Sequence, residues 1–229
     1  MTQAVEKDVL NRSGTISVRT IGLQDYEPVW RAMQQFTDRR DEHTADEIWF
    51  TEHPPVFTLG LNASREHLLA PGDIPVIQID RGGQVTYHGP GQLMIYPLID
   101  LKRGKLGVRD LVTALEQTVV DVAADLDIEA IARADAPGVY VEGRKLASVG
   151  LRVRRGASYH GMALNIAVDL EPFSRINPCG YSDLELTDLN RLGIDESMPD
   201  ITERVLARLL VNLGFDDRTV TKSSEIATE

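Results

Sequence analysis

Short apolar runs bounded by turn-forming residues recur along this chain, and no other feature constrains its fold as strongly. They lie at residues 47–50, 56–59, 76–79, 94–98, 139–141, 146–153 and 162–168. Runs of this kind are typical of β-strands. The pair Glu142-Gly143 separates the fifth run from the sixth, which predicts a β-hairpin with Lys145 just after its turn.

Three longer segments have the spacing of amphipathic helices. Apolar residues recur at intervals of three and four in residues 24–39, 110–125 and 200–213. We expect Asp110 to be the N-cap of the second helix, and Asp200 with Glu203 to form a capping box for the third, which ends at Gly214. Because strands and helices do not alternate strictly, the pattern predicts an α/β protein of the mixed α+β kind, with helices packed against a mixed sheet.

The length and charge of the chain narrow its class. With 229 residues and no Gly/Ser-rich linker, we expect a single domain over residues 1–229, with flexible ends at 1–14 and 216–229. A net charge of -11 and a pI near 4.9 argue against nucleic-acid binding. Neither a secretory signal nor an apolar run long enough for a bilayer is present, so we expect a cytoplasmic protein without membrane contact. We also expect it to be a monomer.

Lysines and arginines gather in two stretches against this acidic background. One holds Lys102, Arg103, Lys105 and Arg109, and the other holds Arg144, Lys145, Arg152, Arg154 and Arg155. Both are candidate docking surfaces for an acidic partner, although most charge runs are solvated surface.

Cys179 is the only cysteine, and it lies in the run Ile176-Asn177-Pro178-Cys179-Gly180, which has neither helical nor strand periodicity. A lone cysteine cannot form an intramolecular disulfide, and a Pro-Cys-Gly turn can present a thiolate to a cleft as a nucleophile. The alternative is an inert buried thiol, because free cysteine is among the most buried residue types. Composition alone favours neither.

A glycine-dense stretch, RGGQVTYHGPGQ at residues 81–92, lies between two predicted strands. Its glycines let the backbone approach a ligand, and Thr86, Tyr87 and His88 offer hydrogen-bonding groups. The stretch matches neither the Walker spacing nor the dinucleotide fingerprint, so it is a weak candidate for a phosphate loop. A sharp crossover without a ligand is the alternative.

Two further segments, GRKLASVG at 143–150 and YHGMALN at 159–165, place small residues in predicted strands. Small residues leave room beside a sheet, as a narrow apolar slot for an acyl chain or a flat ring requires. They equally permit close packing of the strands, so they do not decide the function alone.

Three side chains are candidates for the proton acceptor of the thiol, namely His88, His160 and Lys145. Imidazole titrates near neutrality, which favours the histidines, whereas a lysine has to be desolvated or to lie beside other cations before it acts as a base. An ammonium beside Cys179 would nevertheless favour the thiolate. Spacing in the sequence leaves all three candidates open.

Four segments in this order and spacing resemble the lipoyl(octanoyl) transferase family, whose members transfer octanoyl groups from acyl carrier protein to proteins. They are RGGQVTYHGPGQLMIYPLIDL, GRKLASVG, YHGMALN and INPCG, and the resemblance runs over about residues 53–183. It implies a fold like the catalytic domain of biotin- and lipoate-protein ligases, which is a mixed sheet flanked by helices.

The resemblance also implies roles for particular residues. It implies that Cys179 is the nucleophile and Lys145 its partner. Acyl-substrate contacts are implied at Arg81, Gly82, Gly83, Gln84, Val85, Thr86, Tyr87, His88, Ser148, Val149, Gly150, Gly161, Met162 and Ala163. Tyr181 departs from the aliphatic residue expected there, which affects the lip of the pocket.

The activity implied is the first step of endogenous protein lipoylation. An octanoyl group passes from octanoyl-acyl carrier protein, through a cysteine thioester, to one lysine of a lipoyl domain or of the glycine-cleavage H protein. No ATP, metal or other cofactor is implied.

Three other functions are compatible with parts of the chain. An ATP-dependent lipoate or biotin ligase on the same fold would form an acyl-adenylate and need no cysteine. A cysteine hydrolase would pair Cys179 with His88 or His160 and release free fatty acid, and a non-catalytic module would only hold an acyl chain. The transferase alone accounts for all four segments.

Overall fold

The computed structural model of the protein describes residues 15–177, 184–215 and 220–223. Within these residues the larger of two sheets contains β1 (Ile16–Leu23), β2 (Asp46–Glu52), β6 (Gln92–Leu98), β7 (Ile131–Ala132), β8 (Gly138–Val141), β9 (Arg144–Arg154), β10 (Ala157–Asn165) and β11 (Val220–Ser223). Their order across the sheet is β11-β1-β2-β6-β10-β9-β8-β7. The pairs β11–β1 and β1–β2 are parallel and the remaining pairs are antiparallel, so the predicted mixed sheet is confirmed.

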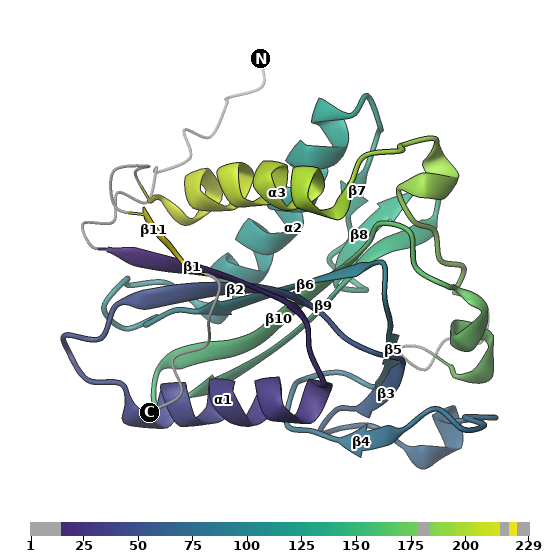
Figure 1. Ribbon diagram of the computed structural model, residues 1–229, viewed down its shortest axis with the longest axis horizontal. Helices are drawn as coiled ribbons and strands as arrows, with labels where there is room; N and C mark the ends of the chain where they lie inside the picture. The colour runs from purple at the N-terminus through teal and green to yellow at the C-terminus, as the bar shows by residue number, and fades with distance from the viewer. Residues whose placement is uncertain (1–14, 178–183, 216–219, 224–229) are drawn as a thin grey trace.

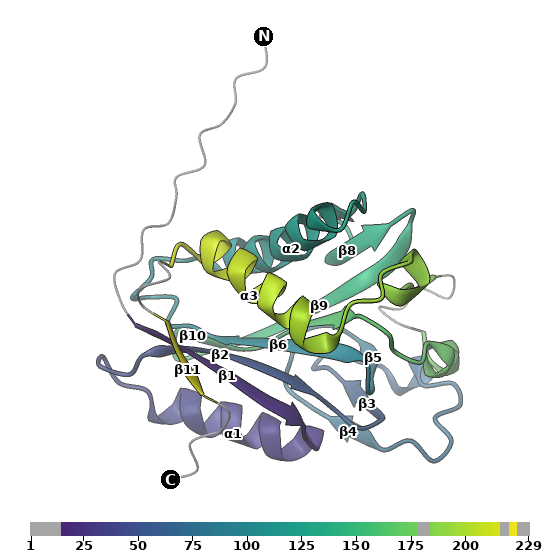
Figure 2. The same cartoon turned by 45° about the horizontal axis from the view of Figure 1, so that its top comes forward.

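Helices cover both faces of this sheet (Figure 1). Helix α1 (Tyr26–Arg39) lies on one face, and α2 (Val108–Asp125) and α3 (Met198–Leu213) lie together on the other (Figure 2). The central strands are therefore shielded from water on both sides, and every residue of β6 and β10 is buried. No helix in the described ranges has the length and apolar character needed to span a membrane.

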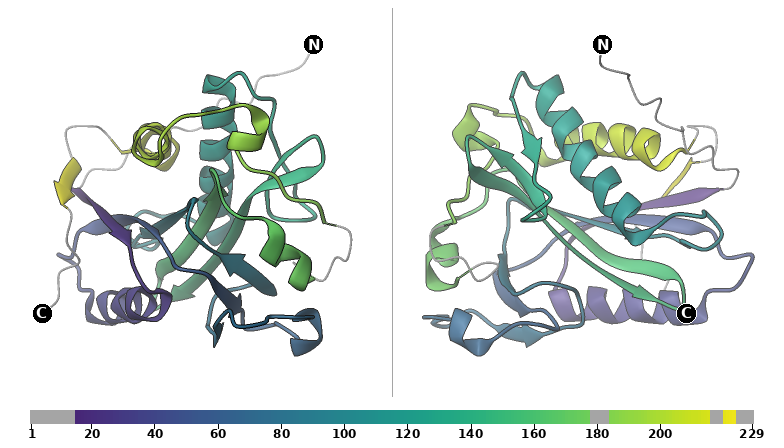
Figure 3. Two further views of the ribbon diagram at one scale, coloured as in Figure 1. Left: turned by 45° about the vertical axis from the view of Figure 1, so that its right-hand side comes forward. Right: turned by 180° about the vertical axis from the view of Figure 1, so that it is seen from behind.

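A second sheet of three strands lies at one end of the large sheet, on the same side as α1 (Figure 3). It contains β3 (Val56–Leu59), β4 (Val76–Gln78) and β5 (Val85–His88), and the short helices η1 (Arg65–His67), η2 (Glu171–Arg175) and η4 (Asn190–Leu192) lie in loops. Phe57, Tyr87 and Phe173 pack together as its small core.

Two of the predicted helix starts are wrong by a few residues. Helix α2 begins at Val108, and Asp110 lies inside its first turn, where its carboxylate accepts the Gly107 N–H at 2.9 Å. Helix α3 begins at Met198 with Ser197 as its N-cap. A polar side chain three residues into a helix satisfies the same free N–H groups as a cap, so pattern alone confuses the two positions. The stop of α3 at Gly214, with φ +74°, is confirmed.

Four residues of the predicted flexible C-terminal end, 220–223, have regular structure. They form β11, an edge strand parallel to β1, with Val220 opposite Ile16 and the Thr221 hydroxyl 3.0 Å from that of Ser17. A polar edge strand is held by backbone hydrogen bonds and has no apolar alternation to reveal it. Residues 1–14, 216–219 and 224–229 lie outside the described residues.

Pro97 and Gly161 shape the middle of the large sheet. Pro97 in β6 has no N–H for the ladder, and the register on either side, Met162 with Ile95 and Ala157 with Asp100, places it opposite His160. There β10 bends, since His160 has a φ of +56°. A methyl group on Gly161 would lie 1.9 Å from the Ile95 carbonyl oxygen, so only glycine allows the two strands to approach this closely.

Candidate active site

A pocket lies between the large sheet, the small sheet and α1. Every residue with a predicted acyl contact lines it except Gly82 and Tyr87, and Lys145 lines it as well. The residues come from the loop before β5, from β5 itself, from β9 and from β10, which are distant in the sequence. The fold therefore gathers three of the four sequence segments around one space. Cys179 and Tyr181, in or just after the fourth segment, lie outside the described residues.

Gly82 and Tyr87 support the pocket without lining it. The Gly82 N–H donates to the Leu151 carbonyl at 3.0 Å, which ties the glycine-dense loop to β9. Side chains alternate along β5, so Tyr87 points away from Thr86 and His88 and packs against Phe57 and Phe173. Their contact with the acyl group stays a prediction, and neither residue lines the pocket.

Several lining residues were missed because they look like ordinary core positions in the sequence. They are Tyr26 from α1, Met94 and Tyr96 from β6, Phe173 from η2 and Leu186. Apolar and aromatic side chains at regular spacing predict burial, and nothing in the pattern says whether they face a neighbour or a cavity. Their presence gives the pocket a largely apolar wall.

The small residues of β9 and β10 serve close packing at two positions. A Cβ on Gly150 would lie 3.1 Å from Cδ of Arg81, whose side chain fills that room. Arg81 is buried, and its guanidinium donates to the carbonyl oxygens of Thr58 and Gly82, each at 2.8 Å. At Gly150 and Gly161, therefore, the glycines admit protein atoms, which is the alternative that the sequence left open.

Lys145 is buried in the pocket wall, with 2% of its surface exposed. It follows the β8–β9 turn as predicted, and both residues of that turn, Glu142 and Gly143, have positive φ. Its N–H donates to the Glu185 carbonyl at 2.8 Å, and its carbonyl accepts the Thr187 N–H at 3.0 Å. Its Nζ lies 5.3 Å from the centre of the Tyr140 ring.

The chain on either side of Cys179 is anchored near this pocket. Before it, the Asn177 N–H donates to the His67 carbonyl at 2.8 Å, and Ile176 pairs with Leu68. After it, the bridge between Leu186 and Lys145 joins the returning chain to β9. Backbone hydrogen bonds thus hold both flanks of the Cys179 segment.

His88 is held in the neutral form by its surroundings. Its Nδ1 lies 2.7 Å from Oε1 of Gln92 and its Nε2 lies 3.4 Å from the Thr58 hydroxyl, while Tyr26 stacks on the ring. Burial lowers the pKa of His88 to about 3. With both ring nitrogens engaged, it is a poor candidate for a base.

His160 lies far from Lys145 along the sheet. It pairs with Leu151 of β9, six residues beyond Lys145, which corresponds to about 20 Å along the strand. Its Nε2 lies 2.9 Å from Oδ1 of Asp80. Burial lowers the pKa of His160, although Asp80 opposes this shift. Of the three candidate bases, Lys145 is the one on β9 beside the segment that follows Cys179.

Asp80 joins α1 to β10 below the pocket. Its carboxylate accepts hydrogen bonds from Trp30 and Gln34 of α1, at 2.8 and 3.2 Å, and from Tyr159 and His160 of β10. Burial raises the pKa of Asp80, but the hydrogen bonds from His160, Tyr159 and Trp30 outweigh it and hold the pKa well below its usual range.

The buried histidines predict a loss of stability in mild acid. Burial lowers the pKa of His53 to about 4 and that of His88 to about 3. Between about pH 6.5 and 4 the unfolded chain therefore binds protons that the folded chain does not. The free energy of unfolding should fall as pH falls, by about 1.4 kcal/mol per pH unit for each histidine. Urea unfolding at pH 7 to 4.5 measures this slope.

Substitution of single histidines shows which of them causes the change in the free energy of unfolding with pH. His53→Gln should remove about half of the slope from these two histidines. The matched control is His43→Gln, since the side chain of His43 is 86% exposed. A free energy of unfolding that stays constant from pH 6.5 to 5 would contradict the prediction.

The fold is that of a known class of catalytic domain, found in lipoate- and biotin-protein ligases. A putative lipoate protein ligase from Thermoplasma acidophilum, solved with lipoic acid, has a TM-score of 0.74 and 13% identity, covering 93% of this chain and 90% of that one. A biotin protein ligase from Aquifex aeolicus has a TM-score of 0.52 and 13% identity, covering 86% and 68%. At these identities the likeness concerns the fold alone.

Sequence relatives narrow the class. The protein-family model of the lipoyl protein ligase A/B catalytic domain matches residues 25–210 of the sequence. Octanoyltransferases from Shewanella sp. (strain ANA-3) and from Nitrosococcus oceani are each 56% identical, over 201 residues (88% of this chain, 93% of the relative) and 211 residues (92% and 94%). The chain belongs to the lipoyl(octanoyl) transferase family and is an acyltransferase for octanoyl groups in protein lipoylation, which confirms the resemblance seen in the sequence.

Proposed function

We propose that this enzyme transfers an octanoyl group from octanoyl-acyl carrier protein to a lysine of a lipoyl domain, through a thioester on Cys179. The observation that carries this proposal is the position of Lys145. This lysine is buried in the wall of a mostly apolar pocket, and its backbone is hydrogen-bonded to the chain that returns from Cys179. The lipoyl domains of lipoate-dependent enzymes and the glycine-cleavage H protein are the acceptors, and the reaction takes place in the cytoplasm.

In the first half-reaction, the Cys179 thiolate attacks the carbonyl carbon of the donor thioester. A carbon–sulfur bond forms on Cys179, the bond to the phosphopantetheine sulfur breaks, and Lys145 gives a proton to the departing thiolate. The acyl chain lies against the apolar wall of Met94, Met162 and Phe173, where each buried methylene contributes about 0.8 kcal/mol.

In the second half-reaction, the amine of the acceptor lysine attacks the thioester on Cys179. A carbon–nitrogen bond forms, the carbon–sulfur bond breaks, and Lys145 takes the proton that the amine loses. The two thioesters are of similar energy and the amide is more stable than either, so the sequence of steps requires no ATP and no metal.

Intact-protein mass spectrometry tests this proposal. The protein is incubated with octanoyl-acyl carrier protein and no nucleotide, and an apo lipoyl domain is then added. We expect a hydroxylamine-labile octanoyl adduct on Cys179 that moves to the acceptor. Transfer only with ATP and free octanoic acid would instead indicate the ligase chemistry, and release of free acid without an acceptor would indicate a hydrolase.

The proposed carrier contact lies at the β9–β10 turn. The second basic stretch is divided by β9, with Arg144 and Lys145 at its start and Arg154 at its end. The Leu101 N–H donates to the Gly156 carbonyl at 3.0 Å, which brings Lys102 beside that turn. We define the turn surface as Lys102, Arg152, Arg154 and Arg155. Arg154 lies four residues beyond Gly150, about 13 Å along the strand from the pocket.

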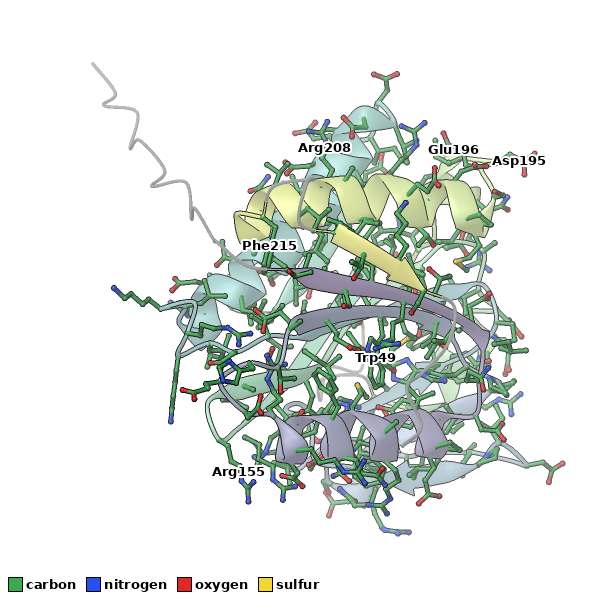
Figure 4. All side chains as sticks on the ribbon, turned by 60° about the vertical axis from the view of Figure 1, so that its left-hand side comes forward. Trp49, Arg155, Asp195, Glu196, Arg208 and Phe215 are labelled. Carbon is green, nitrogen blue, oxygen red and sulfur yellow. The ribbon has the colours of Figure 1, made fainter. Side chains whose placement is uncertain are left out.

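Charge reversal at the turn surface should weaken the donor complex selectively. Arg154→Glu with Arg155→Glu is expected to raise the KM for octanoyl-acyl carrier protein about five- to tenfold, because rim charges steer an acidic partner. The KM for octanoyl-pantetheine should stay unchanged. Arg204→Glu with Arg208→Glu, on the α3 side of the molecule opposite Arg155, is the matched control (Figure 4). An equal rise for both donors would remove the docking role.

A further inference from the structure

Gly138, the first residue of β8, lies directly against the side chain of Lys145. A Cβ at this position would lie 2.9 Å from Cε of Lys145 and 2.4 Å from the Ala147 carbonyl oxygen. Its φ of +135° is one that other residues rarely adopt. The bare backbone of residue 138 is therefore part of the surface on which the lysine side chain rests.

Glu116, from α2 on the far side of β8, holds this backbone in place. Its Oε1 accepts the Gly138 N–H at 2.7 Å, and 9% of the residue is exposed. Burial raises the pKa of Glu116, whereas the Gly138 N–H and the positive charge of Lys145 lower it. The carboxylate thus interacts with Lys145 both through Gly138 and through its charge.

A carboxylate is a costly choice for this position if it serves only to accept one N–H. A neutral amide would accept the same hydrogen bond without the desolvation of a charge. The opposite charge of the buried Lys145 offsets that desolvation, because two opposite charges interact strongly where water is excluded. The pairing of a buried acid with a buried base on neighbouring elements therefore points to a joint role.

We propose that Glu116 is a positioning residue for Lys145. It fixes the Gly138 backbone beneath the lysine side chain and supplies a negative charge that offsets the buried positive charge of Lys145. This inference rests on the role of Lys145 in the proposed function. Glu116 itself touches neither the donor nor the acceptor, and its effect passes through Lys145.

Several other groups surround Lys145. Tyr140 of β8 faces it with its ring, and the segment 185–187 meets it through backbone hydrogen bonds. The neighbouring Arg144 is paired with Glu142 on the hairpin turn at 2.5 Å. Glu116 is an acidic side chain on α2. Its substitution therefore changes the charge beside Lys145 without changing any residue of β9.

A double-mutant cycle separates a positioning role from a structural one. The rate of Cys179 alkylation by iodoacetamide is measured at pH 6 to 9 in the full-length wild type, Glu116→Ala, Lys145→Ala and the double variant. We expect Lys145→Ala to slow alkylation at neutral pH and Glu116→Ala to slow it about tenfold. In the Lys145→Ala background, Glu116→Ala should have no further effect.

Two further variants complete the design. Glu116→Gln keeps an acceptor for the Gly138 N–H but lacks the charge, so it should fold as the wild type does and recover part of the rate. Glu203→Gln, at an exposed acid on α3, is the control and should leave the rate unchanged. Urea unfolding of each variant shows that the folded protein is being compared.

The outcomes distinguish this inference from the proposed function. Equal slowing by Glu116→Ala in both backgrounds, or a wild-type rate in Glu116→Ala while Lys145→Ala is slow, would overturn the positioning role alone. A wild-type rate in Lys145→Ala would overturn the proposed role of Lys145, and the inference with it.

Discussion

Lys145→Ala should slow both half-reactions by about 10²–10⁴-fold, the usual contribution of a positioned acid or base. Without the ammonium, the thiolate loses its partner, the leaving pantetheine sulfur receives no proton, and the incoming amine has no nearby group to accept one. Single-turnover mass spectrometry measures acylation of Cys179 and transfer to the lipoyl domain separately. Both rates should fall, and the KM for the carrier-bound donor should change little.

The control for this substitution is Lys222→Ala, at an exposed position of β11, which should leave both rates at the wild-type level. Acylation of Cys179 at the wild-type rate across pH would show that Lys145 has no such role. His88 would then be the next candidate for the base among the residues that the sequence suggested. Its two ring nitrogens are already bonded, however, to Gln92 and Thr58.

Among substitutions that add one methyl group to the pocket wall, Gly161→Ala should destabilise the protein most. The new Cβ would lie 1.9 Å from the Ile95 carbonyl oxygen and 2.8 Å from Cδ of Pro97. These atoms cannot move aside easily, because β6 is hydrogen-bonded to β2 on one side and to β10 on the other. We expect the free energy of unfolding to fall by about 3 kcal/mol or more, as measured in urea.

Gly143→Ala is the matched control for that result. Gly143 also has no side chain to lose, and a Cβ there would meet nothing within 4 Å, although its φ of +82° is unfavourable for alanine. The expected cost is about 1 kcal/mol, from the backbone alone. Equal destabilisation by the two substitutions would mean that the contact with Ile95 is not what requires glycine at position 161.

Local pattern was sufficient for most of the elements. The helices over α1, α2 and α3 and the β8–β9 hairpin follow from apolar spacing and from Glu142-Gly143, since these signals depend only on residues a few positions apart. The strands β1, β5, β7 and β11 were missed. Strand β5 has only four residues and lies within the glycine-dense stretch, and β11 is mostly polar, so neither is an apolar run of the kind used for the prediction.

The candidate site shows the same division. The residue types in RGGQVTYHGPGQ, GRKLASVG, YHGMALN and INPCG were enough to identify the family, because four segments in register are specific together. They did not show that Tyr87 points away from the pocket, or that Gly150 and Gly161 make room for Arg81 and for the Ile95 backbone. Which way a side chain faces depends on the neighbouring strand.

Periodicity and motif spacing are properties of the linear chain, and they were sufficient to predict the class of fold, the family and the residues to test. Only the tertiary structure showed that both ring nitrogens of His88 have partners and that His160 lies far along the sheet from Lys145. It also brought Glu116 to Gly138 and Lys145. Glu116 precedes Gly138 by 22 positions, and Lys145 pairs with Leu186 from a distant part of the chain. Such neighbours arise when helices and strands pack, and burial and partners then set the protonation of each group.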